Sequence, residues 1–238
     1  MRPVRLNQSI AWLFAVGSSC FVVGSVPAYA NAVGGTADSV TYFVGSIFFT
    51  SASFLQLVQA QTPAMTGVDP ATQHVRSRLT FWAWLPHDRT WLSAATQFPG
   101  TVFFNVSTLA ALAHNASAEE QDRHIWRPDM YGSTLFLVAS ACALLAVRSM
   151  SRGAPRTWVW VIAWINMTGS ILFMASALGS FVLHSTGDLV DVPLAVGGTL
   201  LGAVCFFLGA VLMLPAWKAG VTATPAHVPG TTNTRSTP

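Results

Sequence analysis

Residues 169–177 have the sequence Gly-Ser-Ile-Leu-Phe-Met-Ala-Ser-Ala, in which phenylalanine follows glycine by four positions and two small residues follow at seven and eight. Positions i, i+4, i+7 and i+8 share one side of a helix, so this pattern predicts a stripe with a groove, a knob and a second groove. Such stripes let helices pack closely in lipid. The pattern is an internal repeat, and we expect its glycines to lie at helix contacts. They are Gly17, Gly45, Gly100, Gly132, Gly169 and Gly202.

The composition indicates that the solvent of this chain is a lipid bilayer. It is 52% hydrophobic and 9% charged, whereas about a quarter of the residues of a soluble domain are charged. A membrane-spanning helix needs about 20 mainly apolar residues, and six stretches approach or exceed that length. We therefore expect an all-α, six-helix transmembrane bundle forming a single transmembrane domain over residues 1–215. The expected helices are residues 10–29, 40–60, 98–113, 130–147, 157–183 and 193–215.

The spacing of the repeat predicts that these helices are arranged as three tandem helical hairpins. Consecutive copies are closer in the pairs Gly17–Gly45, Gly100–Gly132 and Gly169–Gly202 than between pairs. The shortest connection inside a pair, residues 31–39, contains Gly34-Gly35, which is typical of a turn. Neighbouring helices of a pair should therefore pack antiparallel.

The charges predict the orientation, because arginine and lysine concentrate in loops that stay in the cytoplasm. With both termini cytoplasmic (N-in/C-in), ten of the twelve basic residues lie inside and only Arg123 and Arg127 lie outside. Arginine far outnumbers the single Lys218, and Ala, Gly and Val are abundant, which is typical of a GC-rich bacterial genome. We expect a multi-pass protein of a bacterial plasma membrane.

The N-terminus admits a second interpretation, a cleaved secretory signal peptide. Arg2 and Arg5 precede an apolar run that ends in Ala28-Tyr29-Ala30, an A-x-A cleavage pattern. Against cleavage, the run is longer than a usual signal core and carries a complete copy of the repeat. We favour the uncleaved helix, and the alternative stays open.

Two segments lie outside the apolar stretches. Residues 61–97 form a basic, tryptophan-rich loop, for which we expect contact with anionic headgroups at the membrane interface rather than a ligand or partner site. Residues 216–238 are rich in Thr, Pro, Ala and Gly, so we expect a disordered cytoplasmic tail.

Few residues are candidates for chemistry. The middle of each span lacks charged residues and histidine, which argues against proton relays and ion-coupled pumps. Asn105 and Asn166 are the deep polar side chains, and we expect interhelical hydrogen bonds from them rather than solute binding. His114 and His184 are the candidates for a haem or metal ligand. We expect no catalytic residue, no metal site and no cofactor, because no motif for one is present.

The helices resemble the YrhK-like hairpins of uncharacterised bacterial polytopic integral membrane proteins. The resemblance rests on residues 169–173 followed by 197–203, on residues 97–101 with Phe104-Asn105, and on residues 126–129 before Gly132-Ser133. It covers most of the chain from Trp12 to Leu214 and implies no activity, so it transfers no catalytic residue. The chain departs from that pattern in having three hairpins rather than one.

Three functions compete. We favour a non-enzymatic structural or stress-related membrane component, because every motif found is a packing motif. The first alternative is a small-solute transporter or channel lined by Asn105, Asn166, Thr108 and Thr168. The second is a haem-binding redox protein using His114 and His184. No nucleic-acid partner is expected, and a homo-oligomer is an open alternative.

Overall fold

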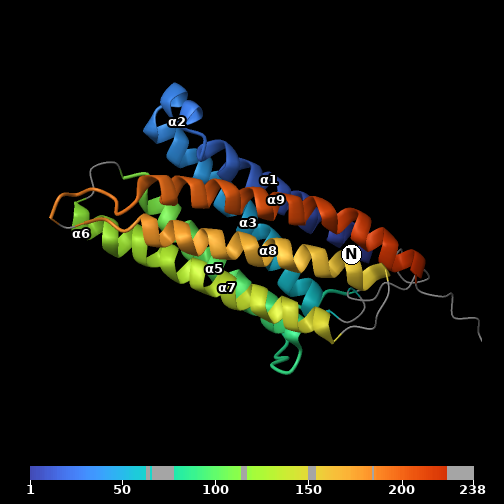
Figure 1. Cartoon of the computed structure of the whole chain (residues 1–238). Helices are drawn as coiled ribbons and strands as arrows, with labels where there is room; N and C mark the ends of the chain where they lie inside the picture. Colours follow the sequence, from blue (N-terminus) through green and yellow to red (C-terminus); the bar gives the residue numbers. More distant parts are fainter. Residues whose placement is uncertain (63–64, 66–77, 114–116, 150–153, 184, 224–238) are drawn as a thin grey trace, which may run out of the picture.

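The computed structural model describes residues 1–62, 65, 78–113, 117–149, 154–183 and 185–223, and in this part of the chain the regular structure is helical. Long helices lie side by side as a bundle (Figure 1). The bounds are α1 Pro3–Gly24, α2 Pro27–Val33, α3 Gly35–Gln61, α5 Arg89–Ala110, α6 Ala118–Gln121, the π-helix η1 Asp122–Trp126, α7 Arg127–Arg148, α8 Ala154–Gly179 and α9 Val192–Ala223.

Five of the described helices are long and apolar enough to cross a membrane, judged by length and composition. They are Pro3–Gly24, Gly35–Gln61, Ala118–Arg148, Thr157–Gly179 and Val192–Lys218. Helix α5 is not among them, although its 22 residues extend about 33 Å, close to the roughly 30 Å of a hydrocarbon core. Polar residues such as Ser93, Gln97 and Asn105 lower its hydropathy.

The first helix lies further toward the N-terminus than expected. It runs over Pro3–Gly24 rather than residues 10–29, because Val26 precedes Pro27 and is extended, with φ −86° and ψ 115°. The candidate cleavage motif Ala28-Tyr29-Ala30 lies in the separate helix α2. Helix α1, which cleavage would remove, packs between α3 and α9.

Helices α5 and α9 extend furthest beyond their expected bounds. Helix α5 begins at Arg89, inside the expected loop 61–97, because the Asp88 side chain caps it by accepting bonds from the backbone N–H groups of Thr90 (2.8 Å) and Trp91 (3.2 Å). Helix α9 continues to Ala223, into the expected tail 216–238, because residues 216–219 are Ala, Trp, Lys and Ala, which favour helix. The part of that tail from residue 224 onward lies outside the described residues.

Six helices close a ring around one core. Each of α1, α3, α5, α7, α8 and α9 contacts the next in this order, and α9 contacts α1. Six phenylalanines point inward and form the centre of the core. They are the phenylalanines of the repeated pattern: Phe21, Phe49, Phe104, Phe136, Phe173 and Phe206.

The glycines of the pattern lie where paired helices approach most closely. A Cβ atom built on Gly17 would lie 2.7 Å from Cδ2 of Phe49 and 2.9 Å from the carbonyl oxygen of Gly45, and a Cβ on Gly45 would lie 3.0 Å from Cδ2 of Phe21. Each phenylalanine ring therefore covers the glycine of the partner helix. In the other two pairs of helices, a phenylalanine ring likewise covers each glycine: Phe136 covers Gly100, Phe104 covers Gly132, Phe206 covers Gly169, and Phe173 covers Gly202.

The bundle exposes large aliphatic side chains on its outside, and it buries small hydroxyl side chains beside its apolar core. Ile171 and Leu201 are 54% exposed, whereas Ser46 and Ser170 are completely buried. Large aliphatic side chains remain exposed along the outside of the long helices, a surface suited to lipid. Others on this surface are Val16, Ile47, Val102, Val138, Leu178 and Leu208.

We predict that Gly202→Leu destabilises the protein by about 1–3 kcal/mol, because the added side chain would overlap the ring of Phe173. Thermal unfolding in detergent measures the effect. The matched control is Gly197→Leu in the same helix, where an added Cβ meets no atom within 4 Å. Equal loss of stability in the two variants would contradict a packing role for Gly202.

Candidate functional site

The six phenylalanines form two stacked layers. Phe49, Phe136 and Phe206 come from α3, α7 and α9 and contact one another, with ring centroids 5.6–6.4 Å apart. In the second layer, Phe173 of α8 contacts Phe21 of α1 at 6.2 Å and Phe104 of α5 at 5.8 Å. Edge-on contacts such as that between Phe104 and Phe136, at 5.0 Å, join the layers. The result is an apolar partition across the axis of the bundle.

One polar cavity lies on the α6 side of this partition, and we call it the Asp129 cavity. Its inner lobe of about 120 Å³ is floored by Phe21, Phe104 and Phe173 and receives residues from all six long helices. An adjoining lobe of about 310 Å³ extends toward η1. The two lobes share four lining residues, Tyr42, Asp129, Ser176 and Thr199.

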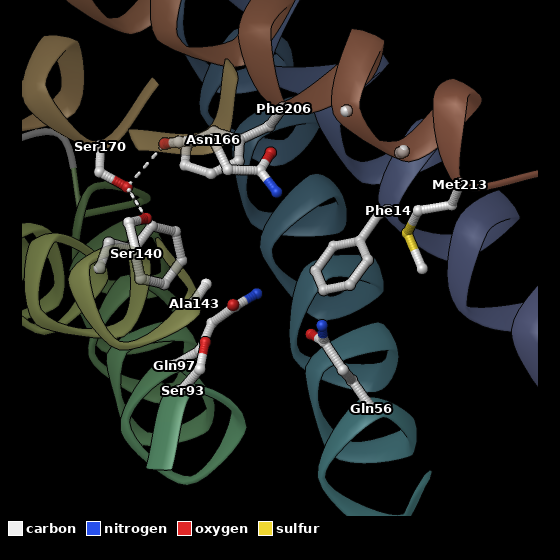
Figure 2. Close-up of a pocket in the computed structure, with 13 residues that line it drawn as sticks. Phe14, Gln56, Ser93, Gln97, Ser140, Ala143, Asn166, Ser170, Phe206 and Met213 are labelled. Atoms are coloured by element: carbon white, nitrogen blue, oxygen red, sulfur yellow. Dashed lines mark hydrogen bonds between the residues drawn. The ribbon is translucent and has the colours of Figure 1, made fainter. Parts of the chain in front are cut away.

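A second polar cavity lies on the opposite side, and we call it the Asn166 cavity. Its axial lobe of about 70 Å³ is bounded by Phe136 and Phe206. Figure 2 shows the amides of Gln56, Gln97 and Asn166 turned toward this space from α3, α5 and α8. A larger lobe of about 630 Å³ shares Gln56 and Asn166 with it, and its size is within the range of ligand sites.

The polar groups of the Asn166 cavity are incompletely paired. The Nδ2 atom of Asn7, the Oε1 atom of Gln56 and the Nε1 atom of Trp217 are buried and have no hydrogen-bond partner in the described part of the chain. Both donors and acceptors are thus left open, a lining suited to a neutral polar solute or to water.

The residues expected to line a polar path have different positions. Thr108 lines the Asp129 cavity and Asn166 lines the cavity named for it. Asn105 lines neither, and its buried Oδ1 atom has no partner within the described ranges. Thr168 is exposed, and its hydroxyl donates to the carbonyl oxygen of Trp164 in its own helix.

Hydroxyl groups make most of the interhelical side-chain hydrogen bonds found among the described residues, and the two asparagines make none of them. Ser46 of α3 pairs with Thr108 of α5 at 2.9 Å, and Ser140 of α7 pairs with Ser170 of α8 at 2.8 Å. Serine and threonine are short enough to bond across tightly packed helices. The expected interhelical bonds of the Asn105 and Asn166 amides are not present in this part of the structure.

The expected haem or metal ligands cannot be placed, because His114 and His184 lie outside the described residues. In the part of the chain that is described, no group of three or more His, Cys, Asp or Glu side chains is arranged to hold a metal ion. Cys20, Cys142 and Cys205 are free thiols in separate helices.

Asp129 is the candidate residue that the sequence did not single out as functional. It lies three residues before Gly132, directly before the expected span 130–147. Asp129 lies in the first turn of α7, which follows α6 and η1 without a break. Its side chain lines the Asp129 cavity.

Comparison with protein-family models, curated proteins and solved structures found no match to this chain. The resemblance to YrhK-like hairpins therefore stays a prediction from the residues alone.

We predict that the Ser140–Ser170 hydrogen bond couples α7 to α8 by about 0.6 kcal/mol, the average for such bonds in membrane proteins. A double-mutant cycle with Ser140→Ala and Ser170→Ala, followed by unfolding in detergent, isolates this term. Ser51→Ala is the control, because the Ser51 hydroxyl bonds only within α3, to Ile47. A coupling of zero for the Ser140–Ser170 pair would show that the bond does not join these helices.

Proposed function

We propose that this chain is a non-enzymatic, multi-pass protein of a bacterial plasma membrane that binds small polar solutes inside its bundle and passes them across, as a transporter or channel. The observation that carries the proposal is the pair of cavities on the bundle axis, one on each side of the phenylalanine partition and each with polar side chains in its lining. The sequence favoured a structural component because cavities are not visible in a packing motif.

In this proposal all six long helices cross the membrane as three tandem hairpins with both termini cytoplasmic. The position of α5 between α3 and α7 supports its inclusion. The polar residues Ser93, Gln97 and Thr108 of α5 line the cavities rather than face lipid. A helix that lines a polar interior needs less overall hydropathy than one surrounded by lipid.

The exchange of rings between paired helices also supports transport. Because Phe21 covers Gly45 while Phe49 covers Gly17, the two helices of the pair are related by an approximate two-fold axis perpendicular to the bundle. Transporters with inverted repeats have such axes in the membrane plane, with solute sites near the midplane. The two cavities, above and below the phenylalanines, fit this arrangement.

The phenylalanine partition would act as a closed gate. Phe49 and Phe136 are at most 4% exposed, and an apolar constriction of this kind blocks polar solutes by excluding water. Opening requires only that rings in one layer rotate or that paired helices separate slightly. The described structure therefore represents the closed state in this proposal.

A structural or stress-related component is the second candidate, and the interlocking glycines and phenylalanines favour it. This role also fits membership of the YrhK-like family, which we retain as a proposal. A haem-binding redox role through His114 and His184 finds no support in the described residues.

The segment before α5 supports placement at a membrane surface. Trp82 is 84% exposed and Trp84 is 72% exposed, next to Arg78 and Arg89 in the sequence. Exposed indole rings beside basic groups suit an interface with anionic headgroups, which we propose as the partner of this loop.

We predict that Phe136→Ala opens the partition and raises glycerol permeation into proteoliposomes by roughly tenfold, since removing a ring lets water enter the constriction. Light scattering after an osmotic step measures permeation. The outward-facing Val138→Ala, at a residue 46% exposed in the same helix, is the control. Unchanged permeation in folded Phe136→Ala protein would favour the structural role instead.

A further inference from the structure

We propose that the Asp129 cavity is a binding site for a small organic ammonium ion, with the Asp129 carboxylate as its counter-ion. The inference names a ligand class for one of the two cavities, and its meaning for transport rests on the proposed function. The binding itself is independent of transport, because it requires only the cavity.

Asp129 is a half-buried carboxyl group that lines the cavity and has no partner among the described residues. Within the described ranges it makes no hydrogen bond and no ion pair, and no Lys, Arg or His of those ranges lines either lobe of the cavity. The nearest arginine in sequence, Arg127, is engaged by Asp122 at 2.8 Å. An interior charge without a partner is costly, so a cationic ligand would stabilise this arrangement.

The O–H and N–H groups of the aromatic residues that line the cavity already donate hydrogen bonds within the protein. Ser25 donates to the carbonyl oxygen of Phe21 at 2.7 Å, so in the 2.8 Å contact between Ser25 and Tyr42 the phenol is the donor. The indole N–H of Trp126 donates to the carbonyl oxygen of Ala177 at 2.8 Å. Neither Tyr42 nor Trp126 has a donor left for a ligand.

The hydroxyl groups of the lining are likewise committed as donors. Thr108 donates to the carbonyl oxygen of Phe104 at 2.7 Å, and Ser180 donates to that of Ala177 at 3.1 Å. Ser176 and Thr199 bond to each other and to the carbonyl oxygen of Ala195. Ser133 donates to the carbonyl oxygen of Phe173.

The lining therefore offers a ligand mainly acceptors. Each committed hydroxyl still has a lone pair, and the carboxylate adds two oxygens. Such a lining repels anions and is poorly matched to a neutral solute that needs donors. It suits a cation with N–H groups or polarised methyl groups.

The aromatic rings distinguish an organic cation from a metal ion. Phe21, Tyr42, Phe104 and Phe173 line the inner lobe, and Trp126 lines the outer one. Aromatic faces attract ammonium ions by cation–π interaction, whereas Na⁺ and K⁺ prefer a shell of oxygen ligands. A carboxylate beside several rings thus favours a small alkylammonium ion.

The test is titration of the purified full-length protein in detergent with tetramethylammonium chloride and with methylammonium chloride, following the thermal unfolding temperature. We expect a saturable rise for at least one of these ions. Binding should weaken roughly tenfold or more in Asp129→Asn, as expected for loss of an interior charge pair, and persist in Asp129→Glu. The exposed Asp188→Asn, at the same end of the bundle, is the matched control and should bind as the unmodified protein does.

Three results would overturn the inference. An equal rise with NaCl or KCl would indicate an inorganic cation site or a salt effect. Equal binding by Asp129→Asn would place the site elsewhere, and no binding by the unmodified protein would remove it. If Asp129→Asn does not fold, the inference requires that Tyr42→Leu loses binding while Asp188→Asn binds as the unmodified protein does.

The outcomes for the two proposals can be told apart. Binding in detergent without flux in liposomes would overturn only the transport proposal, and flux without ammonium binding would overturn only this inference.

Discussion

The close approach of paired helices at glycine, with a phenylalanine from each helix covering the glycine of the other, is the constraint on which the rest of the structure depends. A side chain at Gly17 or Gly45 would overlap both the partner's ring and its backbone. Because lipid supplies no hydrophobic force between helices, such packing is the main source of association in a membrane. It also directs all six rings to the axis, where they form a single apolar cluster.

The polar cavities follow from the same packing. Rings concentrated in the middle of the bundle leave the axial space on either side to be lined by the small residues at positions seven and eight of the pattern and by their neighbours. Ser176 and Ser140 are examples, one in each cavity. Small side chains cannot fill that space, so it stays open. A repeat that explains packing thus also explains why there are two cavities and why a partition separates them.

Much of the architecture was predictable from the sequence. Length and hydropathy predicted an all-helical, membrane-type chain, and helices α3 and α7 begin and end within a few residues of their expected bounds. The errors have local causes: the Val26-Pro27 pair ends α1 early, and the Asp88 cap starts α5 inside the expected loop. Capping and proline effects act over one or two residues, so a search for 20-residue apolar windows does not detect them.

The candidate site was less predictable. Asn166 and Thr108 were named from their depth and do line cavities, whereas Asn105 and Thr168 were named on the same ground and do not. Depth is readable from hydropathy, but the direction of a side chain depends on how each helix is rotated in the bundle. Asp129 was missed because the direction of its side chain, toward solvent or toward the axis of the bundle, depends on the exact position of the residue along the helix.

The central claim is that two water-accessible cavities meet opposite faces of the membrane across the phenylalanine partition. Cysteine labelling tests it most directly, in protein whose native Cys20, Cys142 and Cys205 are replaced by alanine. Ser180 lines the Asp129 cavity and Ser93 lines the Asn166 cavity, so Ser180→Cys and Ser93→Cys place a single thiol in each. With both termini cytoplasmic, as proposed, a small membrane-impermeant methanethiosulfonate should label Ser180→Cys only from the outer face and Ser93→Cys only from the cytoplasmic face. Labelling of both from one face, or of neither, would contradict the account.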